Sequence, residues 1–123
     1  EITVLGGSQT RPNIHIDDIT DLYIFLLKNP DLNGVFNAGF ENLSIMKIAE
    51  LICQIVEAKI IVKPSNDPRS YRIDSSKLLN TGFKPMKNVK DAIKEIAALF
   101  ESGKIQDKPE YYNLNWMKKH IIL

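Results

Sequence analysis

Cysteine is nearly absent from this sequence of 123 residues, which contains only Cys53. One cysteine cannot form an internal disulfide, so the class of small disulfide-stabilised secreted domains is excluded. Cys53 lies among apolar residues at helical spacing, a setting typical of a buried structural thiol rather than a nucleophile. We therefore expect a protein of a reducing compartment, the cytoplasm.

An excess of one charge is also missing, because sixteen Lys and Arg residues against fifteen Asp and Glu residues give a formal charge of +1. The sequence has no basic stripe of the kind that binds nucleic acids. The most apolar stretch, residues 45–58, is interrupted by Lys47, Glu50 and Glu57, so it does not read as a membrane span. Neither a nucleic acid nor a membrane is indicated as a partner.

Residues for metal or nucleophilic chemistry are few. His15 and His120 are the only histidines, and neither belongs to the H-E-x-x-H pattern of zinc enzymes. The chain also has no P-loop and no G-x-S-x-G nucleophile elbow. We predict no metal site and no catalytic residue of these kinds.

The composition, with 44% hydrophobic and 25% charged residues, is typical of one folded domain. Short apolar segments alternate with amphipathic stretches, which predicts an α/β architecture of short strands and three main helices. Strands are expected at residues 2–5, 13–16, 35–38 and 59–63.

The helices are predicted from their capping residues and apolar stripes. Asp17 or Asp18 caps the first helix, Ser44 the second and Asn88 the third. Apolar residues at spacings of three and four place one side of each helix in the core. The residues expected to be buried are Ile19, Leu22, Leu26, Ile48, Ile52, Val56, Ile93, Ile96 and Phe100.

A first candidate site follows the glycine loop after the first strand. The guanidinium of Arg11 suits a phosphate, because it offers two parallel donors. An arginine in a loop is more often simply solvated, so both interpretations stay open. His15 beside Asp17 or Asp18 could serve acid–base chemistry, but a structural hydrogen bond is the commoner role for such a histidine.

A second candidate site is the polar loop at residues 64–72. It carries Asp67, Arg69, Tyr71 and Arg72, a set that could hold a nucleotide through phosphate, ribose or base contacts. A solvated loop with a turn at Asp67 explains the same composition. The residue types alone do not decide between the two.

Five short motifs follow one another along the first hundred residues. They are Arg11 with His15, Ile16 and Asp18; Val35-Phe36-Asn37-Ala38-Gly39; Ser44-Ile45 with Ile48 and Ala49; Asp74-Ser75-Ser76-Lys77; and Thr81-Gly82-Phe83-Lys84-Pro85. Each is weak alone, but in this order they resemble the C-terminal third of the extended short-chain dehydrogenase/reductases that act on nucleotide sugars, the NAD-dependent epimerases and dehydratases. The resemblance implies a fragment of a Rossmann-type fold.

The resemblance also assigns residues to the substrate. It implies that Arg11 contacts the diphosphate of a nucleotide sugar and that the loop around Asp67 closes over the nucleoside. Gln9, Arg69 and Tyr71 complete the predicted substrate-binding set.

One departure from the family pattern concerns the second phosphate arginine. Many epimerases have R-x-G-D in this loop, whereas this chain has Pro64-Ser65-Asn66-Asp67. Arg69 or Arg72 would have to replace the missing arginine.

The family's catalytic machinery is not found in this sequence. No glycines are spaced as in the G-x-x-G-x-x-G cofactor fingerprint, and no tyrosine begins a Y-x-x-x-K motif. The resemblance therefore implies that NAD(P) and the hydride chemistry belong to an intact parent protein, with no cofactor held by this chain.

The sequence begins at Glu1 and its first strand follows at once, so we expect a piece of a longer protein. Residues 1–103 are predicted to form the substrate-binding portion, and residues 104–123 a tail with a helix near residues 114–122. The expected partners are the missing N-terminal Rossmann portion and a nucleotide sugar. Open strand edges make a homo-oligomer a further expectation. The rival hypothesis is a free-standing, non-catalytic binding or interaction module.

Overall fold

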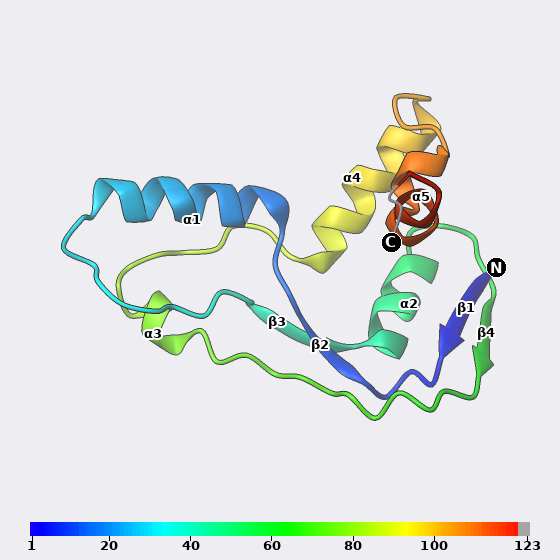
Figure 1. Cartoon of the computed structure of the whole chain (residues 1–123), viewed down its shortest axis with the longest axis horizontal. Helices are drawn as coiled ribbons and strands as arrows, with labels where there is room; N and C mark the ends of the chain where they lie inside the picture. Colours follow the sequence, from blue (N-terminus) through cyan, green and yellow to red (C-terminus); the bar gives the residue numbers. More distant parts are fainter. Residues whose placement is uncertain (121–123) are drawn as a thin grey trace.

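The structure, a computed structural model, describes residues 1–120, which form four short strands and five α-helices (Figure 1). The elements are β1 Ile2–Leu5, β2 Thr10–Asn13, α1 Ile16–Lys28, β3 Glu41–Ser44, α2 Ile45–Cys53, β4 Ile60–Lys63, α3 Ser76–Leu79, α4 Val89–Glu101, the 3-10 turn η1 Pro109–Tyr111 and α5 Asn113–His120. This is the predicted α/β organisation, in which α1, α2 and α4 are the main helices.

The strands form two separate two-stranded sheets. β1 pairs with β4 in parallel, with Ile2 opposite Ile60. β2 pairs with β3 in antiparallel fashion, with Arg11 opposite Leu43. Helix α2 packs on β1 and β4 and buries Val4.

Two small cores lie at opposite ends of the elongated molecule (Figure 1). At the α1 end, Leu22, Leu78 and Phe83 form a buried cluster, and the ring of Phe83 lies 5.5 Å from Phe25 and 5.8 Å from Phe40. At the other end, Val4 and Ala49 are buried where α2 meets β1. The segment 64–75 runs along one side of the molecule from β4 to α3 and joins the two ends (Figure 1).

Two of the three predicted helix caps are confirmed. The hydroxyl of Ser44 accepts a hydrogen bond from the Lys47 amide at 3.0 Å at the start of α2. At α4, Asn88 and Asp91 form a reciprocal capping box. Both caps depend on residues three positions apart, which is why the sequence alone could reveal them.

The predicted cap of α1 is wrong. His15 is the N-cap, and its Nδ1 accepts a hydrogen bond from the Asp17 amide at 3.1 Å. Asp18 instead lies inside the first turn, where its buried carboxylate accepts hydrogen bonds from the amides of Met86 at 2.8 Å and Lys87 at 3.1 Å. Because those amides lie 68 and 69 residues away, spacing could not reveal this contact.

Two strand predictions also need correction. Residues 35–38 form no strand in the described chain. Instead of pairing with a strand, the Val35 carbonyl accepts a hydrogen bond at 2.9 Å from Nζ of Lys77 in α3. The third strand is β3, which the sequence did not suggest; the Phe40 amide extends its pairing by donating to the Asn13 carbonyl at 2.9 Å. The strand expected at residues 13–16 ends at Asn13, because His15 already caps α1.

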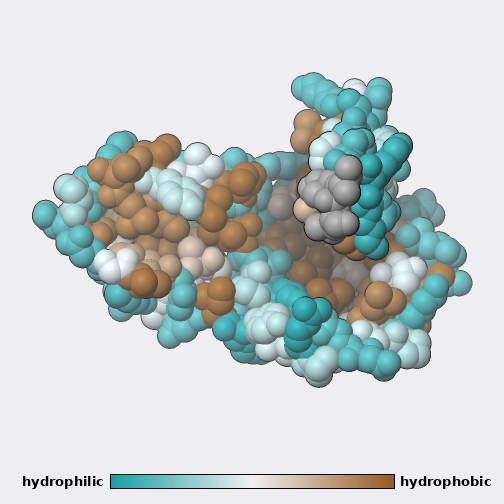
Figure 2. Space-filling view, viewed as in Figure 1, coloured by the Kyte–Doolittle hydropathy of each residue, from teal (hydrophilic) through white to brown (hydrophobic). Residues whose placement is uncertain are grey.

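The burial predictions hold in part. Leu22 is buried, whereas Val56, Ile96 and Phe100 are 41%, 53% and 50% exposed. The other five residues are half-buried: Ile19, Leu26, Ile48, Ile52 and Ile93. The apolar stripes of α2 and α4 do face each other, but an open groove of about 330 Å³ remains between them and exposes its lining. Figure 2 shows brown, apolar surface in the hollow at this end of the molecule.

The tail and the single cysteine agree with the sequence in part. The predicted last helix is α5, while residues 121–123 lie outside the described part of the chain. Cys53 is half-buried rather than buried, and its thiol donates to the Ala58 carbonyl at 3.2 Å. Within residues 1–120, no helix has the length and apolarity needed to cross a bilayer.

Candidate functional site

The polar loop at residues 64–72 docks on the free edge of β2. The Thr10 amide donates to Ser70 Oγ at 3.0 Å, and the Tyr71 amide donates to the Thr10 carbonyl at 3.0 Å. Ile73, two residues beyond Tyr71, is held by the side chain of Asn42, which accepts from the Ile73 amide at 2.9 Å and donates to the Ile73 carbonyl at 3.0 Å. These contacts bring the two candidate sites of the sequence together.

Arg11 lies at the centre of this junction. Its Nη1 donates to the carbonyls of Arg69 at 2.7 Å and Thr10 at 3.0 Å, and its guanidinium carbon lies 5.1 Å from the centre of the Tyr71 ring. Its Nη2 lies 3.5 Å from Asp67 Oδ2. Arg11 Nε makes no hydrogen bond to any residue from 1 to 120, so this edge of the guanidinium can take an outside acceptor.

Asp67 joins the two arginines. Its Oδ1 accepts from Arg69 Nε at 2.7 Å and its Oδ2 from Arg69 Nη2 at 2.8 Å, a two-pronged pairing. The hydrogen bonds from the Arg69 side chain, and then from its backbone amide, lower the pKa of Asp67 to about 2. The same pairing raises the pKa of Arg69. The side chains of Arg11 and Asp67 are 28% and 29% exposed, so solvent reaches the cluster.

Four of the five predicted substrate-binding residues therefore lie together: Arg11, Asp67, Arg69 and Tyr71. We call these four residues the arginine cluster. Gln9 stands apart, because its Oε1 accepts from the Gly7 amide at 2.7 Å and its Nε2 donates to the Leu5 carbonyl at 3.2 Å. Of the two arginines proposed to replace the missing one, Arg69 joins the cluster, and Arg72 makes no hydrogen bond to it.

Sequence reasoning missed the residues that hold this site together. Ser70 and Asn42 fix the loop on the β2–β3 sheet, but neither belongs to a recognisable motif. Their partners are 60 and 31 residues away, so only the pairing of the strands reveals their roles. The motif residues Asp74 and Ser75 likewise turn out to hold the fold: Asp74 Oδ1 accepts from the Ser76 amide, and Ser75 Oγ bonds both backbone groups of Gly39.

A second polar cluster joins α1 to α4. Buried His15 places Nε2 at 3.2 Å from Glu95 Oε2, and Lys87 Nζ lies 2.6 Å from Asp17 Oδ2 and 2.5 Å from Glu95 Oε1. The hydrogen bond from Lys87 lowers the pKa of Asp17, and Asp17 followed by Glu95 raises the pKa of Lys87. His15, Asp17 and Glu95 are close enough to hold a cation. The Lys87 ammonium already lies between the two carboxylates, so the cluster acts as a structural link.

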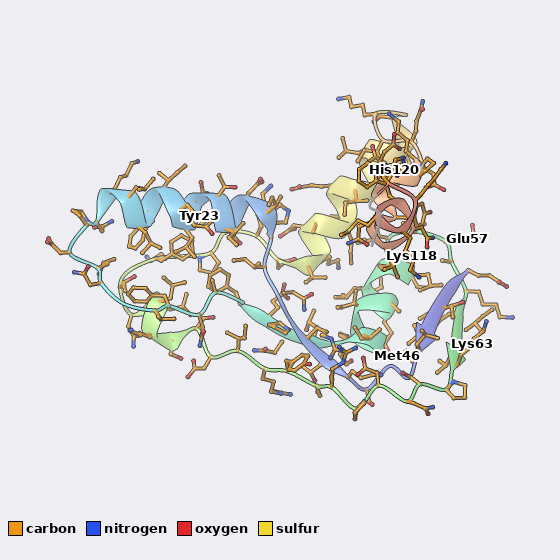
Figure 3. All side chains as sticks on the ribbon, in the orientation of Figure 1. Tyr23, Met46, Glu57, Lys63, Lys118 and His120 are labelled. Carbon is orange, nitrogen blue, oxygen red and sulfur yellow. The ribbon has the colours of Figure 1, made fainter. Side chains whose placement is uncertain are left out.

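The glycine loop after β1 does not fit a dinucleotide cofactor. Gly6 and Gly7 lead into β2 rather than into a helix N-terminus, which is where a pyrophosphate would be bound. A Cβ atom on Gly7 would lie 3.1 Å from Met46 and 3.2 Å from Val4, so this glycine allows the loop to pack on α2. Figure 3 labels Met46 at the start of that helix. A separate hollow of about 530 Å³ lies in the tail and includes no predicted site residue.

No protein-family model matches the chain. Individual relatives do: the chain is 33% identical over 102 residues to GDP-L-fucose synthase 1 of Arabidopsis thaliana, covering 77% of this chain and 31% of that protein. It is 31% identical over 111 residues to the ADP-L-glycero-D-manno-heptose-6-epimerase of Brachyspira hyodysenteriae, covering 81% of this chain and 35% of that protein. The chain thus spans about a third of the length of the curated relatives it matches.

Solved structures share the fold. RMD from Pseudomonas aeruginosa complexed with NADPH has a TM-score of 0.69 at 22% identity, covering 82% of this chain and 35% of that chain. DdhaC has a TM-score of 0.69 at 24% identity, covering 86% of this chain and 34% of that chain. The resemblance found in the sequence is thereby confirmed, and the chain corresponds to the C-terminal part of the extended short-chain dehydrogenase/reductases.

Proposed function

We propose that this chain binds the nucleotide-sugar substrate of an NAD(P)-dependent sugar-nucleotide epimerase or dehydratase. The observation that supports this most directly is the convergence of Arg11 and Arg69, which come from two loci 58 residues apart. The two relatives named above, a GDP-L-fucose synthase and an ADP-L-glycero-D-manno-heptose-6-epimerase, are both named for a nucleoside diphosphate sugar.

The geometry of Arg11 suits a diphosphate. Hydrogen bonds from Nη1 to two backbone carbonyls hold the side chain in place, while Nε and Nη2 lie on the edge that pairs two-pronged with an oxyanion. Arg69, in the loop at residues 64–72, supplies a second fork, which pairs with Asp67 in this structure. The ring of Tyr71 packs on Arg11 and adds an aromatic surface beside the phosphate position.

The redox chemistry is assigned to the rest of the parent protein. NAD(P), when bound there, would supply transient oxidation of the sugar or its reduction. The glycines described here do not fit such a cofactor, so the role of this chain is to hold and orient the substrate.

The outer face of α1 supports a partner for this chain. Ile16, Tyr23 and Leu27 share one side of the helix and are 70%, 66% and 82% exposed, although the opposite side packs on the core. A helix that is apolar on both sides is normally covered on both. Figure 2 shows brown patches along α1, and Figure 3 labels Tyr23 on it. We assign this face to the N-terminal Rossmann portion of the parent.

Residues 1–103 form the substrate-binding portion in this proposal, with residues 104–123 as an appended tail. Cys53 is unpaired, which fits a reducing compartment such as the cytoplasm. The alternative is a free-standing binding module, with a homo-oligomer covering the open surfaces. The gene sequence upstream of Glu1 distinguishes them, because a fragment requires an in-frame G-x-x-G-x-x-G and Y-x-x-x-K.

The binding role is tested by replacing Arg11 with lysine, which keeps the charge but loses the fork. The Arg11→Lys chain should bind GDP-mannose and UDP-glucose more weakly by roughly 1–3 kcal/mol in calorimetry, the range of charge-assisted hydrogen bonds. Arg72→Lys makes the same substitution in the neighbouring loop outside the arginine cluster, and this control should bind like the wild type. If Arg11→Lys kept full affinity while His15→Ala lost it, the site would be at His15 instead.

A further inference from the structure

Asp67 occupies the position between the two guanidinium groups that an outside anion would take. Its two carboxylate oxygens accept from Arg69 Nε at 2.7 Å and Arg69 Nη2 at 2.8 Å, and Oδ2 lies 3.5 Å from Arg11 Nη2. A carboxylate and a phosphate present a similar pair of oxygens to an arginine fork. The Asp67 side chain therefore resembles the phosphate group of the proposed ligand.

Arg11 is fixed more firmly than Asp67 or the side chain of Arg69, whose hydrogen bonds go to Asp67. Arg11 is anchored to the backbone carbonyls of Thr10 and Arg69, and the loop beyond Arg69 is docked on β2. In the described chain, Asp67 is held through its carboxylate and through its amide, which donates to Ser65 Oγ at 3.2 Å. Asp67 can leave the cluster without undoing the anchors of Arg11.

Charge and exposure favour an exchange of anions. Two guanidinium groups against one carboxylate leave the cluster with a net positive charge. Arg69 is 67% exposed, and exposed ion pairs of this kind contribute little stability. A diphosphate carries more negative charge than the carboxylate and offers acceptors to both forks at once.

We infer that Asp67 is the resident counter-ion of the phosphate site: it keeps the forks of Arg11 and Arg69 convergent while the site is empty, and the substrate's diphosphate displaces it. This inference rests on the proposed function and deepens it. Asp67 becomes a positioning residue, in place of the contact with ribose or base that its residue type first suggested. The step exchanges one anion for another and forms no covalent bond.

The test is the affinity for inorganic pyrophosphate, measured by calorimetry at fixed low ionic strength. Asp67→Asn removes the competing charge while keeping the shape of the side chain. Asp31→Asn makes the same change of net charge at an exposed position beyond the far end of α1. We expect Asp67→Asn to bind pyrophosphate about two- to fivefold more tightly than the wild type, and Asp31→Asn to bind like the wild type.

A spectroscopic measurement on the wild-type chain separates displacement from a purely structural role. The ¹³C resonance of the Asp67 carboxylate should move toward that of an unpaired aspartate as pyrophosphate saturates the site. The resonance of Asp31 should not move.

The remaining outcomes distinguish the two proposals. If the wild type binds pyrophosphate and Asp67→Asn binds it equally or more weakly, Asp67 is no displaced counter-ion, while the phosphate site itself stands. An equal gain in Asp67→Asn and Asp31→Asn would be a general charge effect and would also overturn the inference. If none of the three chains binds pyrophosphate, the phosphate site fails and the role of Asp67 fails with it.

Discussion

Asp18 in α1 accepts a hydrogen bond at 2.8 Å from the backbone amide of Met86, which lies just before α4. The same carboxylate accepts from the Lys87 amide at 3.1 Å, and Asp18 is only 1% exposed to solvent. Asp18→Ala would leave two amide donors without partners in a buried place. We expect the free energy of unfolding to fall by about 3 kcal/mol in urea titrations.

The neighbouring Asp17 supplies the control for this prediction. It is exposed and pairs with Lys87 at the surface, so Asp17→Ala should change the urea midpoint only slightly. Similar losses in both variants would mean that Asp18 is not the buried link described here.

His15 should contribute to stability through two separable contacts. His15→Ala removes both the cap of α1 and the contact with Glu95, whereas His15→Asn keeps a side chain able to cap the helix. We expect a loss of about 2 kcal/mol for His15→Ala and about half of that for His15→Asn, measured by urea unfolding. Equal losses would show that the contact with Glu95 dominates.

The ionisation of Asp67 gives a pH prediction. Its pKa is lowered from 3.8 to about 2, so its pairing with Arg69 stabilises the folded chain fully above pH 4 and is lost as the pH falls toward 2. An NMR titration of the Asp67 carboxyl group should show its midpoint near 2. In Arg69→Ala the midpoint should return toward 3.8, and a midpoint that stayed near 2 would mean that Arg69 is not the cause.

The exposed face of α1 should govern association of the isolated chain. Leu27→Glu places a charge on this face, so it should reduce any self-association seen by analytical ultracentrifugation without lowering the urea midpoint. Lys28→Glu, at the adjacent position, changes the net charge of the chain more than Leu27→Glu does, so it is the control for a general charge effect. A wild-type chain that stays monomeric over a wide concentration range would count against this face as a docking surface.

The sequence predicted those parts of the fold that depend on local contacts. The caps Ser44 and Asn88 bond to amides three residues away, so their patterns are visible in the sequence. β3 was missed because the residues Glu41–Ser44 have no strand-like alternation and are extended only through pairing with β2. Val35 looked like part of a strand, but no strand of residues 1–120 pairs with its segment.

The candidate site was predicted for a different reason. Residue types and the family resemblance together singled out Arg11 and Asp67, although 56 residues separate them. The direct contact between them could not be read from the sequence, because it depends on the docking of the loop by Ser70 and Asn42. Gln9 lies outside the arginine cluster, and the sequence did not indicate that its side-chain amide bonds to the glycine loop; its role toward a substrate stays a prediction.

The division of the molecule into two small cores has a consequence for its cooperativity. The end built on Leu78 and the end built on Val4 are joined by narrow connections, among them β2 and the segment 64–75, so each end can open as its own unit in native-state hydrogen exchange. The arginine cluster lies where these two connections meet. A diphosphate held by both arginines would therefore tie these two connections to each other, and it should raise the hydrogen-exchange protection of the segments on either side of the cluster.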